Sequence, residues 1–288
     1  MYSFHRFLFV VVFFAGFNLA SAQANEAVPP SVVELTIPSG DLRMTGFAYL
    51  AAGAGPHPSV LLLHGYPGNE KNLDVAQAMR REGWNVVFFH YRGAWGSEGE
   101  FSYRGAEQDV QTVLSFMRDA KNAERLRIDP NKISIVGHSM GGHMAIAGIL
   151  DNPHVQCAVA YDGVNIGAIA EGMAKNPERA QGWKAYGDSL FMLAGWSGAK
   201  AEQEVTEYAD QFDLRKRAKN INGRPVLLIP ADTQVIPMEL HIYPLQAALE
   251  ATDDAKISVV LIDDDHSYSG SRLELIDTTA KFLNGACR

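Results

Sequence analysis

The sequence predicts an α/β fold in which a mostly parallel, doubly wound sheet begins with an antiparallel hairpin and carries a helical insertion. Short apolar runs alternate with helical stretches, which is typical of parallel βαβ units. Two runs, 32–37 and 45–50, are joined only by residues 38–41, a turn-forming Pro-Ser-Gly-Asp sequence that predicts the hairpin. Between 163 and 223 no run has the pattern of a strand. We expect this segment to be a helical cap over the substrate pocket.

The remaining elements are expected in alternation along the chain. Strands are predicted over 60–64, 86–90, 132–136, 155–161, 226–229 and 257–262, and helices over 106–120, 144–150 and 272–283. The sequence shows no internal repeat and no low-complexity segment. One large domain over residues 23–288 is therefore expected.

Residues 1–22 have the features of a secretory signal peptide. Arg6 precedes an apolar core over 7–17, and the small residues 20–22 resemble a cleavage site. The core is shorter than the roughly 20 apolar residues that a membrane span needs, although an uncleaved anchor is the alternative interpretation. The expected location is secreted or periplasmic, without membrane attachment after cleavage.

The composition argues against several kinds of partner. The formal net charge is −8, and the Lys and Arg residues form no cluster, so neither nucleic acid nor an anionic membrane is expected as a partner. No Cys/His spacing indicates a metal site and no dinucleotide motif is present, so no cofactor is expected. Export would permit a disulfide between Cys157 and Cys287, but Cys157 falls on a predicted buried strand, and the pairing stays open.

The stretch 137–142, Gly-His-Ser-Met-Gly-Gly, joins an apolar strand to a small-residue helix. A serine at the apex of such a strand-turn-helix has a strained backbone, and the residues two before and two after it must lack bulk. Gly137 and Gly141 occupy these places. Glycine-rich turns also serve as packing or phosphate loops, but no Lys-Ser/Thr follows here. The pattern predicts a nucleophile elbow with Ser139 as the nucleophile.

A serine nucleophile requires a base, and His266 is the candidate among nine histidines. It follows the apolar strand 257–262 in a polar loop, from which an imidazole can reach over the edge of the sheet. A solvated loop histidine is the alternative. His64 is expected to have a structural role under the oxyanion loop, and His138 is expected to point away from the face of the serine.

The acid that orients the base is left between two residues. Asp232 follows the strand 226–229 and keeps the chain order Ser, Asp, His, so it is the first candidate. Asp162, directly after the strand 155–161, is the main competitor. The acidic triplet 263–265 is interpreted as a solvated turn in which one member is placed to orient His266.

Two backbone N–H groups are predicted to form an oxyanion hole. Met140 follows the serine, so its N–H points toward the reacting centre. The second donor comes from the loop 64–68, His-Gly-Tyr-Pro-Gly, which leaves a buried strand. Pro67 has no N–H to donate, which indicates Tyr66.

These residues resemble the α/β-hydrolase superfamily, and within it the prolyl-oligopeptidase-like and dienelactone-hydrolase-like branch. The similar stretches are 34–38, 58–68, 91–102 and 128–130 running into the elbow. The resemblance implies a catalytic role for Ser139 and His266, with Met140 and Tyr66 as oxyanion donors. The chain departs from the family at the acid: relatives carry Gly-x-x-Asp, whereas residues 230–233 contain no glycine, and Thr233 competes for the aligned place.

The predicted function is hydrolysis of a small-molecule carboxylic ester through an acyl-enzyme. Hydrolysis of an amide or short peptide requires the same residues, together with a pocket group that binds a peptide amine. Glu98 or Glu100 is the candidate for that group; the alternative is that both belong to a solvated loop. A catalytically silent binding protein on the same fold is the remaining class, although such proteins usually lose the serine, the histidine or the elbow glycines. The ester itself and the oligomeric state stay open.

Overall fold

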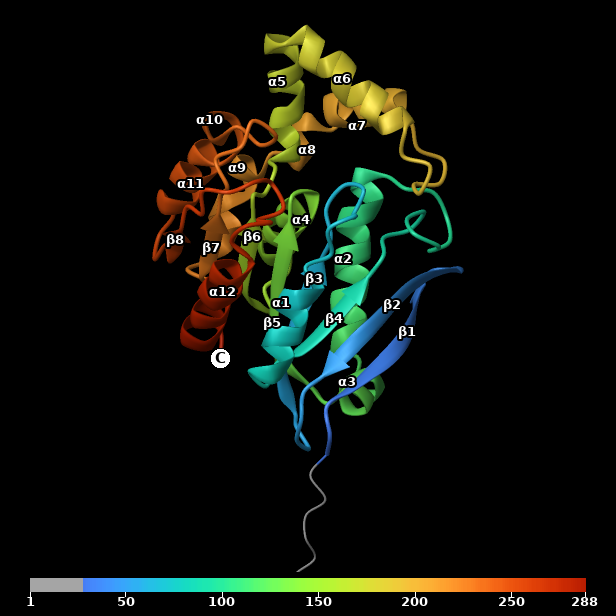
Figure 1. Ribbon diagram of the computed structural model, residues 1–288, viewed down its shortest axis with the longest axis vertical. Coiled ribbons are helices and arrows are strands. Elements are labelled where there is room, and N and C mark those ends of the chain that lie inside the picture. The colour runs from blue at the N-terminus through green and yellow to red at the C-terminus, as the bar shows by residue number, and fades with distance from the viewer. Residues whose placement is uncertain (1–27) are drawn as a thin grey trace, which may run out of the picture.

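One sheet of eight strands forms the centre of this computed structural model, which describes residues 28–288 (Figure 1). The strands are β1 (Ser31–Ser39), β2 (Leu42–Leu50), β3 (His57–Leu63), β4 (Asn85–Phe89), β5 (Ile128–His138), β6 (Val155–Tyr161), β7 (Val226–Ile229) and β8 (Ile257–Val259). Their order is β1-β2-β4-β3-β5-β6-β7-β8, with β2 antiparallel to β1 and β4 and all other pairs parallel. The predicted fold class, with its N-terminal hairpin, is confirmed.

Helices cover both faces of this sheet. The α-helices outside the segment 163–223 are α1 (Leu73–Arg81), α2 (Tyr103–Arg118), α3 (Ala120–Leu126), α4 (Met140–Asp151), α10 (Met238–His241), α11 (Tyr243–Glu250) and α12 (Arg272–Ala286). The pair α1 and α12 packs on one face, while α2 and α4 pack on the other (Figure 1). The sheet is therefore doubly wound, as the alternating pattern predicts.

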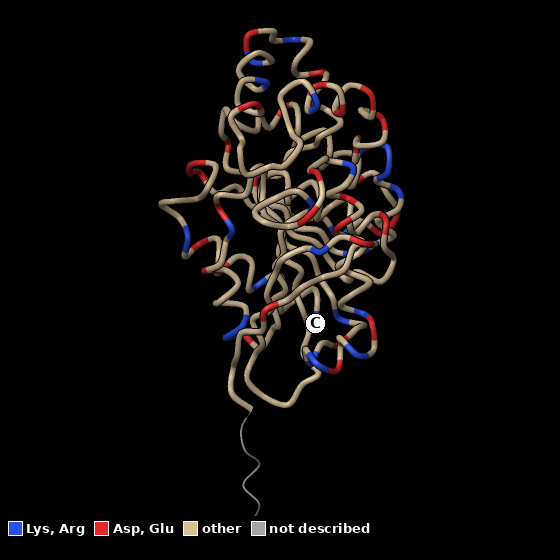
Figure 2. Tube along the Cα trace, turned by 90° about the vertical axis from the view of Figure 1, so that its right-hand side faces the viewer, with Lys and Arg blue, Asp and Glu red and all other residues tan. Residues whose placement is uncertain are grey.

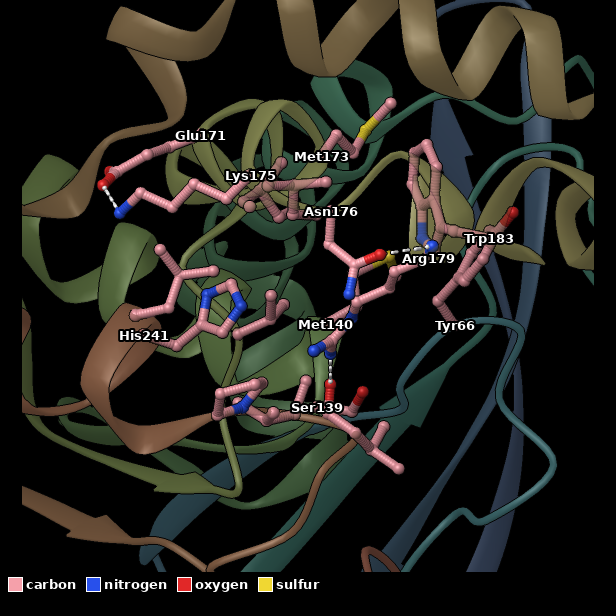
Figure 3. Close-up of a pocket in the computed structure, with 18 of the residues that line it drawn as sticks. Tyr66, Ser139, Met140, Glu171, Met173, Lys175, Asn176, Arg179, Trp183 and His241 are labelled. Carbon is pink, nitrogen blue, oxygen red and sulfur yellow. Dashed lines mark hydrogen bonds and ion pairs between the residues drawn. The ribbon is translucent and has the colours of Figure 1, made fainter. Parts of the chain in front are cut away.

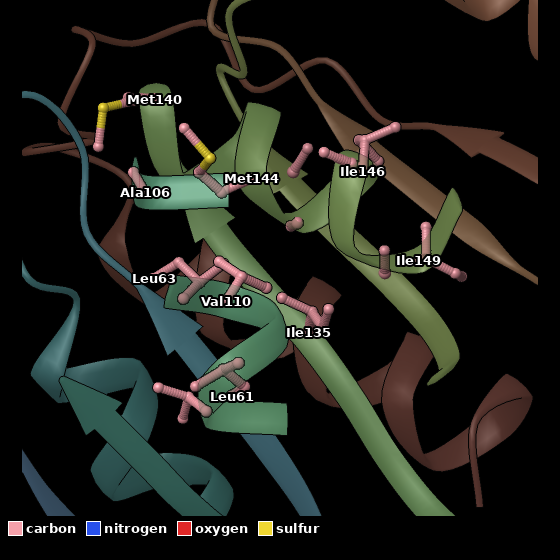
Figure 4. Close-up of a cluster of buried hydrophobic side chains, with 14 of the residues drawn as sticks. Leu61, Leu63, Ala106, Val110, Ile135, Met140, Met144, Ile146 and Ile149 are labelled. Carbon is pink, nitrogen blue, oxygen red and sulfur yellow. The ribbon is translucent and has the colours of Figure 1, made fainter. Parts of the chain in front are cut away.

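The central strands are buried on both faces, which explains their continuous apolar sequences. Leu61 of β3 and Ile135 of β5 pack with Val110 of α2 and Met144 of α4 (Figure 4). Neighbouring residues of the same strands point to the opposite face, where Leu62 belongs to the cluster under α1 and α12. This two-sided core holds β5 rigidly, and the candidate nucleophile follows at its carboxyl end.

Most predicted boundaries are close to the observed ones, and the differences have local causes. β6 and β7 have the predicted bounds. α2 begins three residues early because the Ser102 side chain accepts a hydrogen bond from the Gly105 N–H and caps the helix. β8 ends at Val259 instead of residue 262, although the N–H groups of Val260 and Ile262 still donate to the carbonyl oxygens of Leu228 and Pro230.

The segment between β6 and β7 contains only helices, as predicted. They are the short 3-10 helices η1 (Ile166–Ala168) and η2 (Ala218–Ile221) and the helices α5 (Ile169–Lys175), α6 (Pro177–Asp188), α7 (Gly198–Glu207), α8 (Ala209–Phe212) and α9 (Leu214–Arg217). Figure 1 shows α5, α6 and α7 beyond the carboxyl ends of the parallel strands. The insertion thus lies over the edge of the sheet at which β5 ends.

A disulfide joins Cys157 on β6 to Cys287, the residue after α12, with Cα atoms 5.8 Å apart. The open question about this pair is settled in favour of the bond. The burial of Cys157 does not exclude it, because α12 packs on the same face of β6.

The predicted signal sequence, residues 1–22, lies outside the described residues. Within residues 28–288, no helix is both long enough and apolar enough to cross a bilayer. Acidic and basic residues are interspersed along the chain trace in Figure 2.

Candidate active site

The nucleophile elbow has the predicted geometry. Ser139 stands between β5 and α4 with φ 58° and ψ −118°, a left-handed conformation that is strained for a residue with a side chain. A Cβ atom on Gly137 would lie 1.9 Å from the Gly141 carbonyl oxygen, and one on Gly141 would lie 2.3 Å from the Leu63 oxygen. Neither place admits a larger residue: Gly137 is required by the turn itself, and Gly141 by the close approach of the end of β3.

His266 makes its orienting contact with Asp162. The imidazole Nδ1–H donates to Asp162 Oδ2 over 2.6 Å. Asp162 is fully buried and accepts two further hydrogen bonds, from the Ala231 N–H at 3.3 Å and from the Thr233 hydroxyl at 3.1 Å. A carboxylate held by three donors keeps Nδ1 protonated and leaves Nε2 free to accept a proton.

The prediction that Asp232 contacts His266 is wrong. Asp232 is exposed, and its neighbour Thr233 is the residue that donates to Asp162. Asp162 lies nearer to the elbow than Asp232 does, because it follows β6, which pairs directly with β5. The Ser139 N–H donates to Tyr161 O over 2.8 Å, and the Val164 N–H donates to Ser139 O over 3.2 Å. The loop that carries Asp162 is therefore bonded to the peptide of the serine itself.

The loop that carries His266 is fixed by its own hydrogen bonds. Asp264 and Asp265 accept from the backbone N–H groups of residues 267, 269 and 270, so these two carboxylates stabilise the loop, while the imidazole is oriented by Asp162. His138 Nε2–H donates to the His266 carbonyl oxygen over 2.6 Å. Burial lowers the pKa of His138 to about 4, which keeps that ring neutral near pH 7. His138 thus supports the His266 loop, and its ring lies 4.6 Å from the His266 ring, centre to centre.

The loop 64–68 lies against the serine, as the oxyanion prediction requires. A Cβ on Gly65 would be 2.9 Å from Ser139 Cβ. His64 is buried and its Nδ1–H donates to Gly65 O over 2.8 Å, which confirms its structural role; burial lowers its pKa to about 3. Within residues 28–288, the N–H groups of Tyr66 and Met140 have no hydrogen-bond partner. Both residues line the cavity beside Ser139 (Figure 3).

A cavity of about 590 Å³ opens above Ser139, and His266 also lines it. No hydrogen bond joins Ser139 to His266 within the described part of the chain. One wall is aromatic and comes from the body and the insertion together: Tyr66, Tyr103, Trp183 and Tyr186. The Trp196 Nε1–H donates to the Tyr66 hydroxyl over 2.7 Å, and burial raises the pKa of Tyr66 to about 12. The aromatic residues of the insertion thus contribute to the pocket.

Charged side chains line the outer end of the cavity, and most of them are paired. Lys175 lies 2.7 Å from Glu171, and Arg215 lies 2.8 Å from Asp213. Arg179 on α6 donates to the carbonyl oxygens of Gln234 and Val235 at 3.0 and 2.7 Å. This single side chain joins the insertion to the loop after β7 across the cavity (Figure 3).

Two further predicted candidates have other partners. Glu98 is paired with Arg43, and Glu100 lies 3.3 Å from Lys200, so the two residues are engaged at the surface. Within residues 28–288, no group of His, Cys, Asp and Glu side chains is arranged to hold a metal ion.

Sequence reasoning missed Thr233 as a partner of the acid and the polar lining from the insertion. Asp162 follows β6, the strand that pairs with the elbow strand, but the sequence alone does not show which strands are neighbours and so does not separate Asp162 from Asp232. The polar lining had no signal, since helix ends with Lys, Arg and Glu are usually solvated.

Comparison with known proteins gives a consistent result. The BD-FAE family model matches residues 49–169, which include the predicted oxyanion loop and the elbow. Among solved structures, the esterase Pf2001 of Pyrococcus furiosus superposes with a TM-score of 0.64 at 16% identity, covering 90% of this chain and 94% of that one. An acylaminoacyl peptidase of Pyrococcus horikoshii gives 0.65 at 16% identity, covering 90% and 42%. The chain has the α/β-hydrolase fold.

Among curated proteins, the lysophosphatidylserine lipase ABHD12 of Bos taurus is 31% identical over 239 residues, which cover 76% of this chain and 53% of that lipase. The matches span about half, or less, of the length of the curated relatives. Together these likenesses support the predicted membership of the superfamily and of its prolyl-oligopeptidase-like esterase branch.

Proposed function

We propose that this protein is a secreted or periplasmic serine hydrolase that cleaves carboxylic esters through an acyl-enzyme. The observation that carries the proposal is the elbow at Ser139, which faces the same cavity as an imidazole paired with a buried carboxylate. Export is supported by the pattern of residues 1–22 and by the Cys157–Cys287 bond, because disulfides persist in oxidising compartments.

The residues have distinct roles in this mechanism. Ser139 Oγ attacks the ester carbonyl while His266 Nε2 takes its proton, and Asp162 stabilises the resulting imidazolium. The N–H groups of Met140 and Tyr66 hold the oxyanion, and each such donor contributes about 100- to 1000-fold in rate. His266 then protonates the leaving alcohol. In the second half, it activates a water molecule that releases the acid and restores the serine.

Amide hydrolysis is the second candidate function, and it is supported by the similarity of the fold to that of an acylaminoacyl peptidase. Glu98 and Glu100, the predicted anchors for a peptide amine, do not line the cavity and pair with basic residues at the surface, which favours esters. Hydrolysis of p-nitrophenyl esters and aminoacyl p-nitroanilides by the mature protein separates the two. We expect the esters to be the better substrates by kcat/KM.

Labelling with a fluorophosphonate tests the serine directly. We expect one covalent adduct on Ser139, seen by mass spectrometry, and none in Ser139→Ala. Ser115→Ala, an exposed serine on α2, is the matched control and should label like the unmodified chain. A protein that stays blank under these conditions would support the silent binding protein instead.

A further inference from the structure

His241 is a buried histidine that the proposed mechanism does not use. It lies at the end of α10, is 4% exposed, and lines the cavity (Figure 3). Its Nδ1 accepts a hydrogen bond from the Asn165 backbone N–H over 3.3 Å. The Asn165 side chain is itself fixed, since it donates to Asp213 and accepts from the Leu214 N–H. The orientation of the imidazole is thus set by a rigid partner on the loop that follows Asp162.

The protonation of this ring follows from its contacts. Burial, aided by the charges of Arg179 and Arg215, lowers the pKa of His241 to about 4, so the ring is neutral near pH 7. Because Nδ1 accepts a hydrogen bond, the single ring proton is on Nε2. Within residues 28–288, Nε2 has no hydrogen-bond partner. The structure therefore places a fixed, neutral N–H donor at the cavity wall, and no group of the described residues accepts from it.

The surroundings of the donor make it selective. The cavity lining around the insertion and the 236–244 segment is largely apolar, including Ile166, Ile236, Leu240 and Pro244. The nearby cations are engaged elsewhere: Lys175 with Glu171, Arg215 with Asp213, and Arg179 with two carbonyl groups. The carboxylate of Glu239, on the same helix as His241, also lines the cavity, and its residue is exposed. A ligand that fills this region without an acceptor would bury an unpaired N–H, which is costly.

We propose that His241 determines substrate specificity by donating its Nε2–H to an oxygen atom of the substrate, a hydroxyl or ether group remote from the scissile ester. This inference deepens the proposed esterase function and rests on it, because the bound molecule is a substrate only if Ser139 cleaves it. The donor selects oxygenated over purely hydrocarbon groups, while the aromatic wall contacts the apolar remainder of the ligand.

Binding without turnover tests the inference. In the Ser139→Ala chain, calorimetry compares alkanoic acids with ω-hydroxyalkanoic acids of the same length, from four to eight carbons. We expect at least one length at which the hydroxy acid binds about 10- to 100-fold more tightly. His241→Phe should abolish that preference. His241→Gln should retain it, because a carboxamide can accept from the Asn165 N–H and donate to the ligand. His154→Phe, an exposed histidine, is the matched control.

A second readout follows the donor itself. In the spectrum of the protein with 15N-labelled histidine, the Nε2 resonance of His241 should shift when the hydroxy acid binds and stay in place with the alkanoic acid. Equal affinities at every length, or a preference that survives in His241→Phe, would overturn the inference. A preference that depends on His241 in a protein that neither hydrolyses esters nor reacts with fluorophosphonate would refute the proposed function and leave the binding role intact.

Discussion

Replacing Asp162 by asparagine should remove almost all turnover, because the amide forces His266 into the wrong tautomer. Oδ1 of Asp162 accepts from the Ala231 N–H, and Oδ2 accepts from His266 and Thr233. An asparagine that keeps its oxygen toward Ala231 turns its NH2 toward His266 Nδ1. The imidazole must then accept at Nδ1 and hold its proton on Nε2, where it no longer takes a proton from Ser139.

The opposite amide orientation does not rescue the site. It directs the NH2 group at the Ala231 N–H, and two buried donors would then face each other without an acceptor. We therefore expect kcat to fall about 10⁴-fold, which corresponds to about 5.4 kcal/mol of transition-state stabilisation. The variant should still fold, since aspartate and asparagine have nearly the same shape.

Steady-state hydrolysis of a p-nitrophenyl ester measures the effect, with thermal melting as the check on folding. Asp232→Asn is the matched control: this side chain is exposed, and its variant should stay within about twofold. Thr233→Val removes one hydrogen bond to the carboxylate and should lower kcat by about tenfold. A 10⁴-fold loss in Asp232→Asn together with normal turnover in Asp162→Asn would refute the assignment.

Three further predictions concern stability. Gly141→Ala should lower the free energy of unfolding by roughly 1 kcal/mol or more, as overpacking does, because the added Cβ meets the Leu63 backbone. Gly182 has open space around it, so Gly182→Ala should not lower the free energy of unfolding. Chemical denaturation of the two variants compares them. Cys157→Ser should cost about 2–5 kcal/mol, since the bond closes a separation of 130 residues, and an unchanged melting temperature would contradict this. Folding lowers the pKa values of His64 and His138, so the unfolded chain binds protons before the folded one does. The free energy of unfolding should therefore fall as the pH drops from about 6.5 toward 4, by about 1.4 kcal/mol per pH unit for each of the two histidines. Denaturation at several pH values measures that slope, and a flat profile would argue against it.

The fold was predictable because its signals are local. Apolar runs bounded by turns predicted the observed bounds of β6 and β7, and the elbow was readable because Gly137 is required by a contact within the turn itself. The same holds for the oxyanion loop, where one proline limits the donors.

The acid was not predictable in this way. Asp162 and Asp232 both follow buried strands, both precede His266 in the chain, and both have a left-handed backbone. The choice depends on which carboxylate is buried beside the imidazole loop, and that is a property of three strands packed together. Residues 230–233 lack the glycine that relatives carry in this turn, and Thr233 donates to Asp162. This departure is the local sequence feature that points away from Asp232.

The covalent link between β6 and the end of α12 bears on when the catalytic geometry can form. Asp162 follows the carboxyl end of β6, and His266 precedes the start of α12. The disulfide therefore joins the two elements that support this pair, on the side away from the pair itself. If the chain is exported, as its first residues predict, the clamp closes only after translocation. Newly made chains in a reducing cytoplasm would then hold this pair of side chains less firmly, and full competence would arrive with oxidation at the destination.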